Sequence, residues 1–134
     1  MKKALVRPSN TGALMTASAL PASVDAMLDL LKARGYFAER ELAIVKSRVP
    51  GISAKLSQQV VRFVQALRDQ DFYKSPGVAE TIDWATALTE LDARSLTPQV
   101  VGDTLGALLK YQDDIARMQG DSLQKVLKEA TSEN

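Results

Sequence analysis

The feature that most constrains this chain is a helical repeat of apolar residues between residues 53 and 68. Apolar side chains recur there at intervals of three and four residues, as on the buried face of an amphipathic α-helix. Ser53 stands where the N-cap of such a helix is expected. The apolar stripe consists of Leu56, Val60, Phe63, Val64 and Leu67, and Lys55, Gln59, Arg62 and Arg68 lie off it.

Five further segments carry helix signals around apolar residues. One follows Ser23 and stops at Gly35, and one runs from Ala38 to Arg48 before a Val-Pro-Gly break. The others start at Pro76, after Thr97 and at Asp121, where proline at the first helical position or a capping box is the signal. The buried face after Pro76 is predicted to hold Val78, Ile82, Ala85, Leu88 and Leu91. That after Thr97 is predicted to hold Val100, Val101, Leu105, Leu108 and Leu109.

These patterns predict an all-α fold. No run combines strict alternation with β-branched residues, so a sheet is not expected. Helices with one apolar face bury it against one another, and the short connections favour antiparallel neighbours. We expect a small helical bundle of about five or six helices, formed by a single domain over residues 21–134. Residues 1–20 have no apolar period and are predicted to be a flexible N-terminal arm.

The composition of the chain argues against several classes of function. The chain has 17 basic and 16 acidic side chains, so its net charge of +1 offers little attraction for nucleic acid or an anionic membrane. It has no cysteine and no histidine, which removes the commonest metal ligands, a thiol nucleophile and the commonest general base. We therefore expect no cofactor, no metal site and no catalytic residues, and we expect a cytoplasmic protein without a membrane span.

Two groups of residues are candidate binding sites. Lys74, Ser75 and Gly77 precede a predicted helix, whose free amides attract anions, so they form a candidate anion or nucleotide-proximal site. An ordinary capped helix start is the alternative. Phe72, Tyr73 and Trp84 are candidate anchors for a protein partner, with core packing as the alternative for the tryptophan.

Carboxylates that are close in sequence are candidates for acid and base chemistry. The pairs are Glu39 with Glu41, Glu80 with Asp83, and Asp113 with Asp114. A pair of carboxyl groups with different pKa values can serve as acid and base. Exposed charge is the interpretation we favour for all three pairs, because acidic side chains usually lie on solvated faces.

Four ordered phrases of the sequence resemble a known family. They are ELAIVKSRVPG at 41–51, FVQALR at 63–68, YKSPGVAETIDW at 73–84 and TLGALLKYQDD at 104–114. Together they look like the C-terminal helical lid of MoxR-type AAA+ ATPases, in the CoxD-like branch. The resemblance covers about residues 36–130. Residues 23–36 also resemble the short helix that opens such ATPases, which suggests a truncated or internally deleted relative.

The resemblance implies a role without the family's ATPase activity. The chain has no Walker A or Walker B motif, and residues 77–80 lack the sensor arginine that many lids carry. What remains is a non-catalytic interaction module whose partner is an AAA+ ATPase or a von Willebrand A domain protein, or a second copy of the chain. One alternative is an adaptor that contributes to nucleotide binding by an ATPase ring in trans. A helical nucleic-acid binder is a further alternative, disfavoured by the balanced charge.

Overall fold

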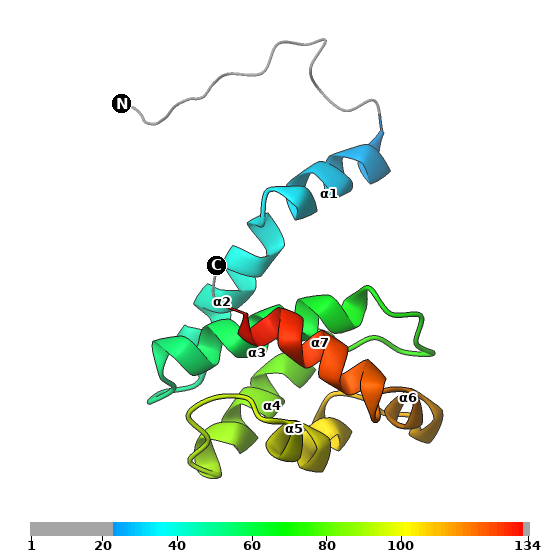
Figure 1. The fold of residues 1–134 in the computed structure, drawn as a ribbon. Helices are drawn as coiled ribbons and strands as arrows, with labels where there is room; N and C mark the ends of the chain where they lie inside the picture. The colour runs from blue at the N-terminus through cyan, green and yellow to red at the C-terminus, as the bar shows by residue number, and fades with distance from the viewer. Residues whose placement is uncertain (1–22, 133–134) are drawn as a thin grey trace. The chain divides into compact units, whose positions relative to one another are not determined.

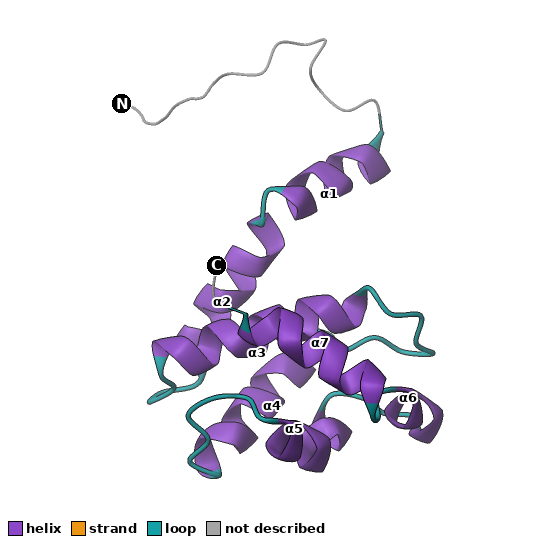
Figure 2. Ribbon diagram, in the orientation of Figure 1, coloured by secondary structure: helices purple, strands orange, loops and turns teal. Residues whose placement is uncertain are grey.

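The computed structural model describes residues 23–132, and these residues form helices and connections without a strand (Figures 1 and 2). The predicted all-α class is confirmed. In chain order the elements are α1 (Val24–Ala33), α2 (Tyr36–Arg48), α3 (Ala54–Arg68), α4 (Val78–Glu90), α5 (Pro98–Thr104), the 3-10 helix η3 (Leu105–Ala107), α6 (Gln112–Arg117) and α7 (Asp121–Thr131).

The chain divides into two units, residues 1–37 and residues 38–134. In the first unit, Ser23 caps α1 as predicted, because its hydroxyl accepts the Ala26 N–H at 3.1 Å. Gly35 follows α1 with a φ of +76°, which glycine adopts readily. The predicted arm at residues 1–20 lies outside the described residues, and the single domain over 21–134 stays a prediction.

Helix α3 is the central element of the second unit. It contacts α7 and α4, and α4 in turn contacts α5 (Figure 1). All five residues of the predicted α3 stripe are buried, so this prediction is confirmed. Gln59 is buried as well, although the periodicity puts it off the stripe, because its side-chain oxygen accepts the Leu96 N–H at 2.8 Å. The other helices and the segment after η3 complete the core chiefly with Val45, Trp84, Leu88, Val101, Leu105, Leu109 and Leu127.

The start of α4 differs from the prediction. Its N-cap is Gly77, so Ser75 lies outside the helix and Pro76 does not occupy the first helical position. The Gly77 N–H donates to the Glu80 carboxylate at 2.8 Å, which is the contact that the third helical residue makes in a capping box, and Gly77 has no side chain to complete the other half. Val78 and Leu91, at the two ends of the predicted stripe, are exposed.

Other helix ends follow the sequence signals only in part. Ser53 and Thr97 cap α3 and α5 as predicted, with side-chain oxygens 3.1 and 3.2 Å from the amides three residues on. Helix α7 begins at Asp121, but Gly120 is its N-cap and no side chain caps it, so the predicted capping box is wrong. The short helix α6 is additional to the predicted elements.

Candidate functional site

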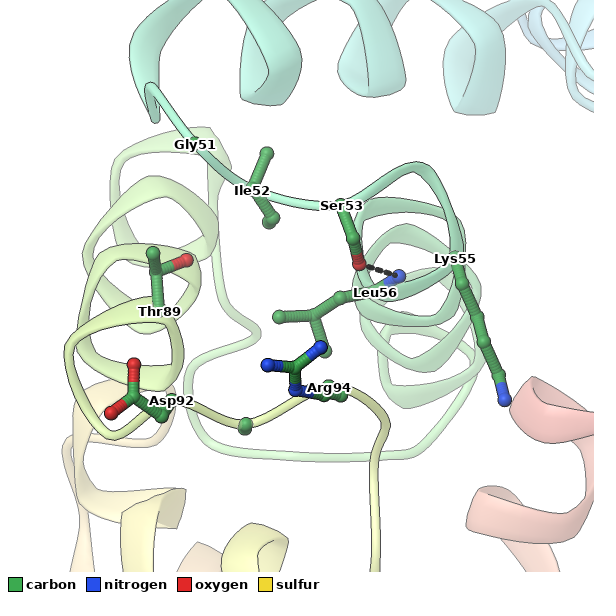
Figure 3. A pocket seen from close by; sticks show the side chains of 9 residues that line it. Gly51, Ile52, Ser53, Lys55, Leu56, Thr89, Asp92 and Arg94 are labelled. Carbon is green, nitrogen blue, oxygen red and sulfur yellow. Dashed lines mark hydrogen bonds between the residues drawn. The ribbon is translucent and has the colours of Figure 1, made fainter.

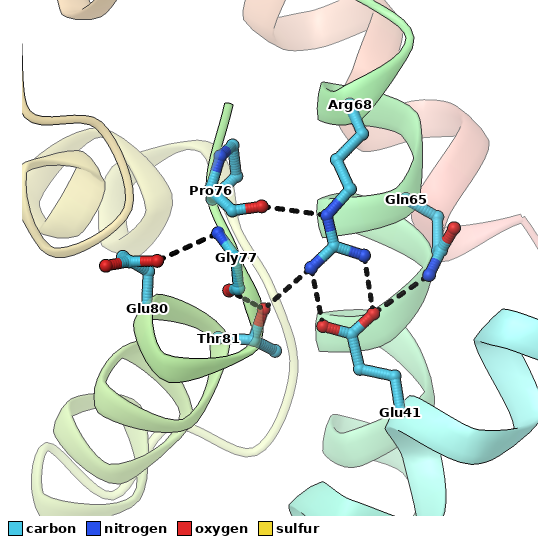
Figure 4. Close-up of polar contacts among 7 residues, drawn as sticks. All are labelled: Glu41, Gln65, Arg68, Pro76, Gly77, Glu80 and Thr81. Carbon is cyan, nitrogen blue, oxygen red and sulfur yellow. Dashed lines mark hydrogen bonds and ion pairs between the residues drawn. The ribbon is translucent and has the colours of Figure 1, made fainter. Parts of the chain in front are cut away.

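The connection between α3 and α4, residues 69–77, is held by side chains from three other parts of the second unit. One of these side chains is Arg68, which is itself held by Glu41 on α2. Glu41 is only 3% exposed. Arg68, at the end of α3, donates from Nη1 and Nη2 to the two Glu41 oxygens at 2.7 Å each. Gln65 Nε2 donates to the same carboxylate at 2.8 Å (Figure 4). The result is a bidentate, buried ion pair between α2 and α3.

The same arginine extends to the start of α4. Its Nε donates to the carbonyl oxygen of Pro76 at 2.8 Å, and its Nη2 lies 3.4 Å from the Thr81 hydroxyl oxygen (Figure 4). All three guanidinium nitrogens of Arg68 therefore have a partner. Since the planar fork has a fixed geometry, Arg68 sets the position of Pro76 relative to Glu41.

The surroundings of Glu41 keep it ionised. Burial acts to raise its pKa, but hydrogen bonding to Arg68 and Thr81, the charge of Arg68 and the hydrogen bond from Gln65 together lower it below the ordinary value of 4.5. Glu41 was expected to be exposed, and this expectation is wrong. Glu41 accepts hydrogen bonds from side chains of α3. Because its charge is paired and its oxygens are satisfied, the carboxylate can be buried there.

Asp114 on α6 holds the connection from the other side. It is fully buried, and its two carboxylate oxygens accept the backbone N–H groups of Tyr73 and Lys74 at 3.0 and 3.2 Å. The expectation of an exposed Asp114 is therefore also wrong. Backbone amides outside helices need other acceptors, and the Asp114 carboxylate provides two for Tyr73 and Lys74 in the connection between α3 and α4.

The candidate anion site depended on Lys74, Ser75 and the backbone amides from Gly77 onward. Asp114 accepts from Tyr73 and Lys74, and Glu80 accepts from Gly77. The Gly77 hydrogen bond is the main cause that lowers the pKa of the Glu80 carboxyl, and the charges of Lys110 and Lys74 contribute. Two carboxylates thus occupy the place predicted for an anion. The anion site at Lys74, Ser75 and Gly77 is therefore not favoured, because these carboxylates repel negative charge.

The three aromatic candidates do not share a surface. Trp84 is fully buried, its ring lies 5.3 Å from that of Phe63, and its Nε1 donates to the Thr104 hydroxyl oxygen at 2.8 Å. The interface hypothesis for Trp84 is wrong for this bundle, and core packing is correct. Phe72 is partly buried beneath Arg117, whose guanidinium carbon lies 5.8 Å from the ring centre. Tyr73 is 76% exposed and is the one candidate that remains available to a partner.

A separate pocket of about 420 Å³ lies between the connection that precedes α3 and the connection that follows α4 (Figure 3). Its lining includes Lys55, Asp92 and Arg94, whose charged groups lie apart from one another in Figure 3, and the Ser53 hydroxyl is turned to its capping contact on Leu56. Nothing in the sequence singles out these residues, because they come from connections far apart in the chain. Its charges are of both signs, so they favour neither a cation nor an anion.

Neither a metal-binding cluster nor a membrane-spanning helix is found within residues 23–132. Within these residues no group of three or more acidic side chains is placed to hold a metal ion. None of their helices has the length and apolar character needed to cross a membrane. Comparison of the chain with protein-family models, with curated proteins and with solved structures finds no match.

The Glu41 ion pair predicts how stability depends on pH. Because the folded-state pKa lies below 4.5, ionised Glu41 stabilises the fold above that pH, and this contribution is lost as the pH falls through the folded-state pKa. Glu41→Gln should lower the free energy of unfolding at pH 7 by about 1–3 kcal/mol, because Arg68, whose side chain is 25% exposed, loses the charge of its partner. The difference from the wild type should shrink below pH 4.5.

Urea unfolding between pH 3 and pH 7 measures both effects. Glu39→Gln is the matched control, since Glu39 is exposed on the same helix, and it should change stability by less than about 0.5 kcal/mol. A gap between wild type and Glu41→Gln that is independent of pH would show that the ion pair does not hold Glu41 ionised.

The Asp114 contacts predict that a change at this residue speeds hydrogen exchange at the two amides that it accepts. In Asp114→Asn one oxygen is replaced by an NH₂ donor, so one of the Tyr73 and Lys74 amides loses its acceptor. An unsatisfied amide costs about 1–3 kcal/mol, which corresponds to hydrogen exchange about 5 to 150 times faster at these two amides. Asp113→Asn, next to it and exposed, should leave both exchange rates unchanged. Equal exchange in the two variants contradicts the assignment.

Proposed function

We propose that this chain is a non-catalytic helical module that docks onto a protein partner, and that it is related to the lid of MoxR-type AAA+ ATPases. The observation that carries the proposal is that residues of all four lid-like phrases take part in two sets of hydrogen bonds around the connection at residues 69–77, one centred on Arg68 and one on Asp114. Glu41 comes from the first phrase, Arg68 from the second, Pro76 and Thr81 from the third, and Asp114 from the fourth.

This arrangement supports the proposal because it gives the four phrases a shared structural role. A family resemblance spread over 74 residues (41–114) is most meaningful where the matching positions contact one another. Here the matching side chains hold the connection at residues 69–77 against α2 and α6. These hydrogen bonds support a lid-like arrangement of helices around this connection, with the connection itself at the surface.

The distribution of charge supports docking rather than nucleotide binding. An adaptor that contacts nucleotide in trans would use Lys74 and the amides that follow it, and the Gly77 amide among these donates to Glu80. The Glu41 and Asp114 carboxylates, which were candidates for acid and base chemistry, serve as buried acceptors. We propose the cytoplasm as the compartment, and as partner an AAA+ ATPase or a von Willebrand A domain protein.

The test is direct binding between purified proteins. The chain is titrated against the MoxR-type ATPase and the von Willebrand A domain protein of the same cell, and complex formation is followed by analytical ultracentrifugation. We expect saturable binding to one of them. Tyr73→Ala should weaken it at least about tenfold, since an exposed tyrosine at an interface centre is worth about 1.4 kcal/mol or more.

Leu91→Ala is the control, because Leu91 is similarly exposed, at 61%, on the connection at the other end of α4. It should leave affinity unchanged. If neither protein binds, the proposal fails. If the chain alone forms dimers whose population rises with concentration, the partner is a second copy and the ATPase assignment is wrong.

A further inference from the structure

A pocket of about 480 Å³ lies where the connection at residues 69–77 meets the start of α6. It is lined by Tyr73, Tyr111, Gln112 and Asp113. Tyr73 comes from the connection, and the other three are consecutive in the chain. The sequence did not bring them together as a candidate site, because residues 73 and 111 meet only through tertiary packing.

Two aromatic rings form one wall of this pocket. Tyr73 is 76% exposed and Tyr111 is 52% exposed, although each ring carries a large apolar area. Their centroids are 6.1 Å apart with an angle of 65° between the ring planes, an edge-to-face arrangement. Neighbouring exposed aromatic side chains at a concave site are typical of protein recognition surfaces.

The backbone beneath both rings is fixed. The buried Asp114 carboxylate accepts the Tyr73 N–H, and the carbonyl oxygen of Tyr111 accepts the Ile115 N–H at 3.0 Å. Arg117, at the end of α6, donates to the Asp71 carbonyl oxygen and covers the Phe72 ring. The connection and α6 are thus joined on both sides of the aromatic pair. A binding partner would meet a preorganised site and would lose less conformational entropy in ordering it.

Among the residues that line the pocket, Asp113 carries the one charged side chain. Asp113 is exposed and makes no hydrogen bond or ion pair within residues 23–132. Two lysines flank the pocket in the chain without lining it: Lys110, whose Nζ lies 3.7 Å from Glu80 Oε2, and Lys74, whose charge also stabilises ionised Glu80. One unpaired carboxylate therefore stands beside the two aromatic rings.

We propose that this pocket receives an arginine side chain of the docking partner. A guanidinium group is planar, stacks on aromatic faces and donates paired hydrogen bonds to a carboxylate, and here Tyr73 or Tyr111 offers the face and Asp113 the carboxylate. The Gln112 amide oxygen is a further acceptor at the rim. The inference rests on the proposed docking function and names the chemistry of the group that docks.

The experiment is an NMR titration of the full chain with N-acetyl-arginine amide, and with the citrulline analogue as a neutral probe of nearly the same shape. We expect saturable shifts at the backbone amides of Tyr73, Tyr111, Gln112 and Asp113 with the arginine probe. The citrulline probe should bind at least about fivefold more weakly, because it lacks the charge that pairs with Asp113.

Two variants locate the interaction. Asp113→Asn should weaken arginine binding at least about threefold, and Tyr111→Ala should abolish the saturable shifts. Asp121→Asn is the control, since Asp121 is likewise an exposed aspartate in the first turn of a helix. Equal binding of both probes, or unchanged binding in Asp113→Asn, overturns the inference.

Failure of this inference is distinguishable from failure of the docking function. If Asp113→Asn binds the partner protein as tightly as the wild type does, the arginine pocket is wrong and the docking function stands. If the arginine probe binds at the pocket but neither candidate protein binds the chain, the docking function is wrong and the pocket stands as a guanidinium site.

Discussion

The buried ion pair between Glu41 and Arg68 is the interaction on which the arrangement around α4 depends. Burying a carboxylate costs several kcal/mol unless its oxygens are satisfied, and here Arg68 and Gln65 supply three hydrogen bonds to it. Such a pair adds little net stability over an apolar contact of the same size. Its consequence is geometric. The planar guanidinium group of Arg68 sets the positions of α2, α3 and Pro76, which lies two residues before α4, relative to one another.

Side-chain carboxylates also stabilise the connection that follows Arg68. Residues 69–77 form no helix; the amides of Asp69, Gln70 and Phe72 donate to nearby backbone carbonyls, and those of Tyr73, Lys74 and Gly77 donate to side chains. Asp114 reaches this segment from α6 and Glu80 reaches it from the first turn of α4. The connection is therefore ordered without regular hydrogen bonding of its own. This order places Tyr73 beside Tyr111 at the surface, where both rings remain exposed.

Periodicity and capping chemistry predict most of the helices but few of the polar contacts. The α3 stripe and the caps at Ser53 and Thr97 are local features, and the structure confirms them. The start of α4 could not be placed correctly, because Pro76 after Ser75 is a strong start signal whereas the observed cap depends on Glu80 and on Arg68 at the Pro76 carbonyl. The helix start that Pro76 predicts is therefore displaced by contacts of Glu80 within α4 and of Arg68 outside it.

The burial of Glu41 and Asp114 could not be predicted for a similar reason. Each is an acidic residue with an acidic neighbour, a pattern that usually indicates a solvated face. Their acceptor roles depend on Arg68 and on the amides of Tyr73 and Lys74, which lie 27 to 41 residues away in the chain. The lid resemblance spans these positions, but it stays a prediction and a part of the proposed function.

The measurement that tests the central claim most directly is amide hydrogen exchange in Arg68→Lys, with Arg62→Lys as the matched control on the same helix. Lysine keeps the charge opposite Glu41 but cannot bond Glu41 and the Pro76 carbonyl together. We expect the amides of Tyr73, Gly77 and Thr81 to exchange at least about tenfold faster in Arg68→Lys, while those of α7 change much less. Arg62, which is exposed and contacts the Ser132 carbonyl, should have no such effect on these amides. Unchanged exchange at Gly77 and Thr81 in Arg68→Lys would contradict the claim that this arginine positions the start of α4.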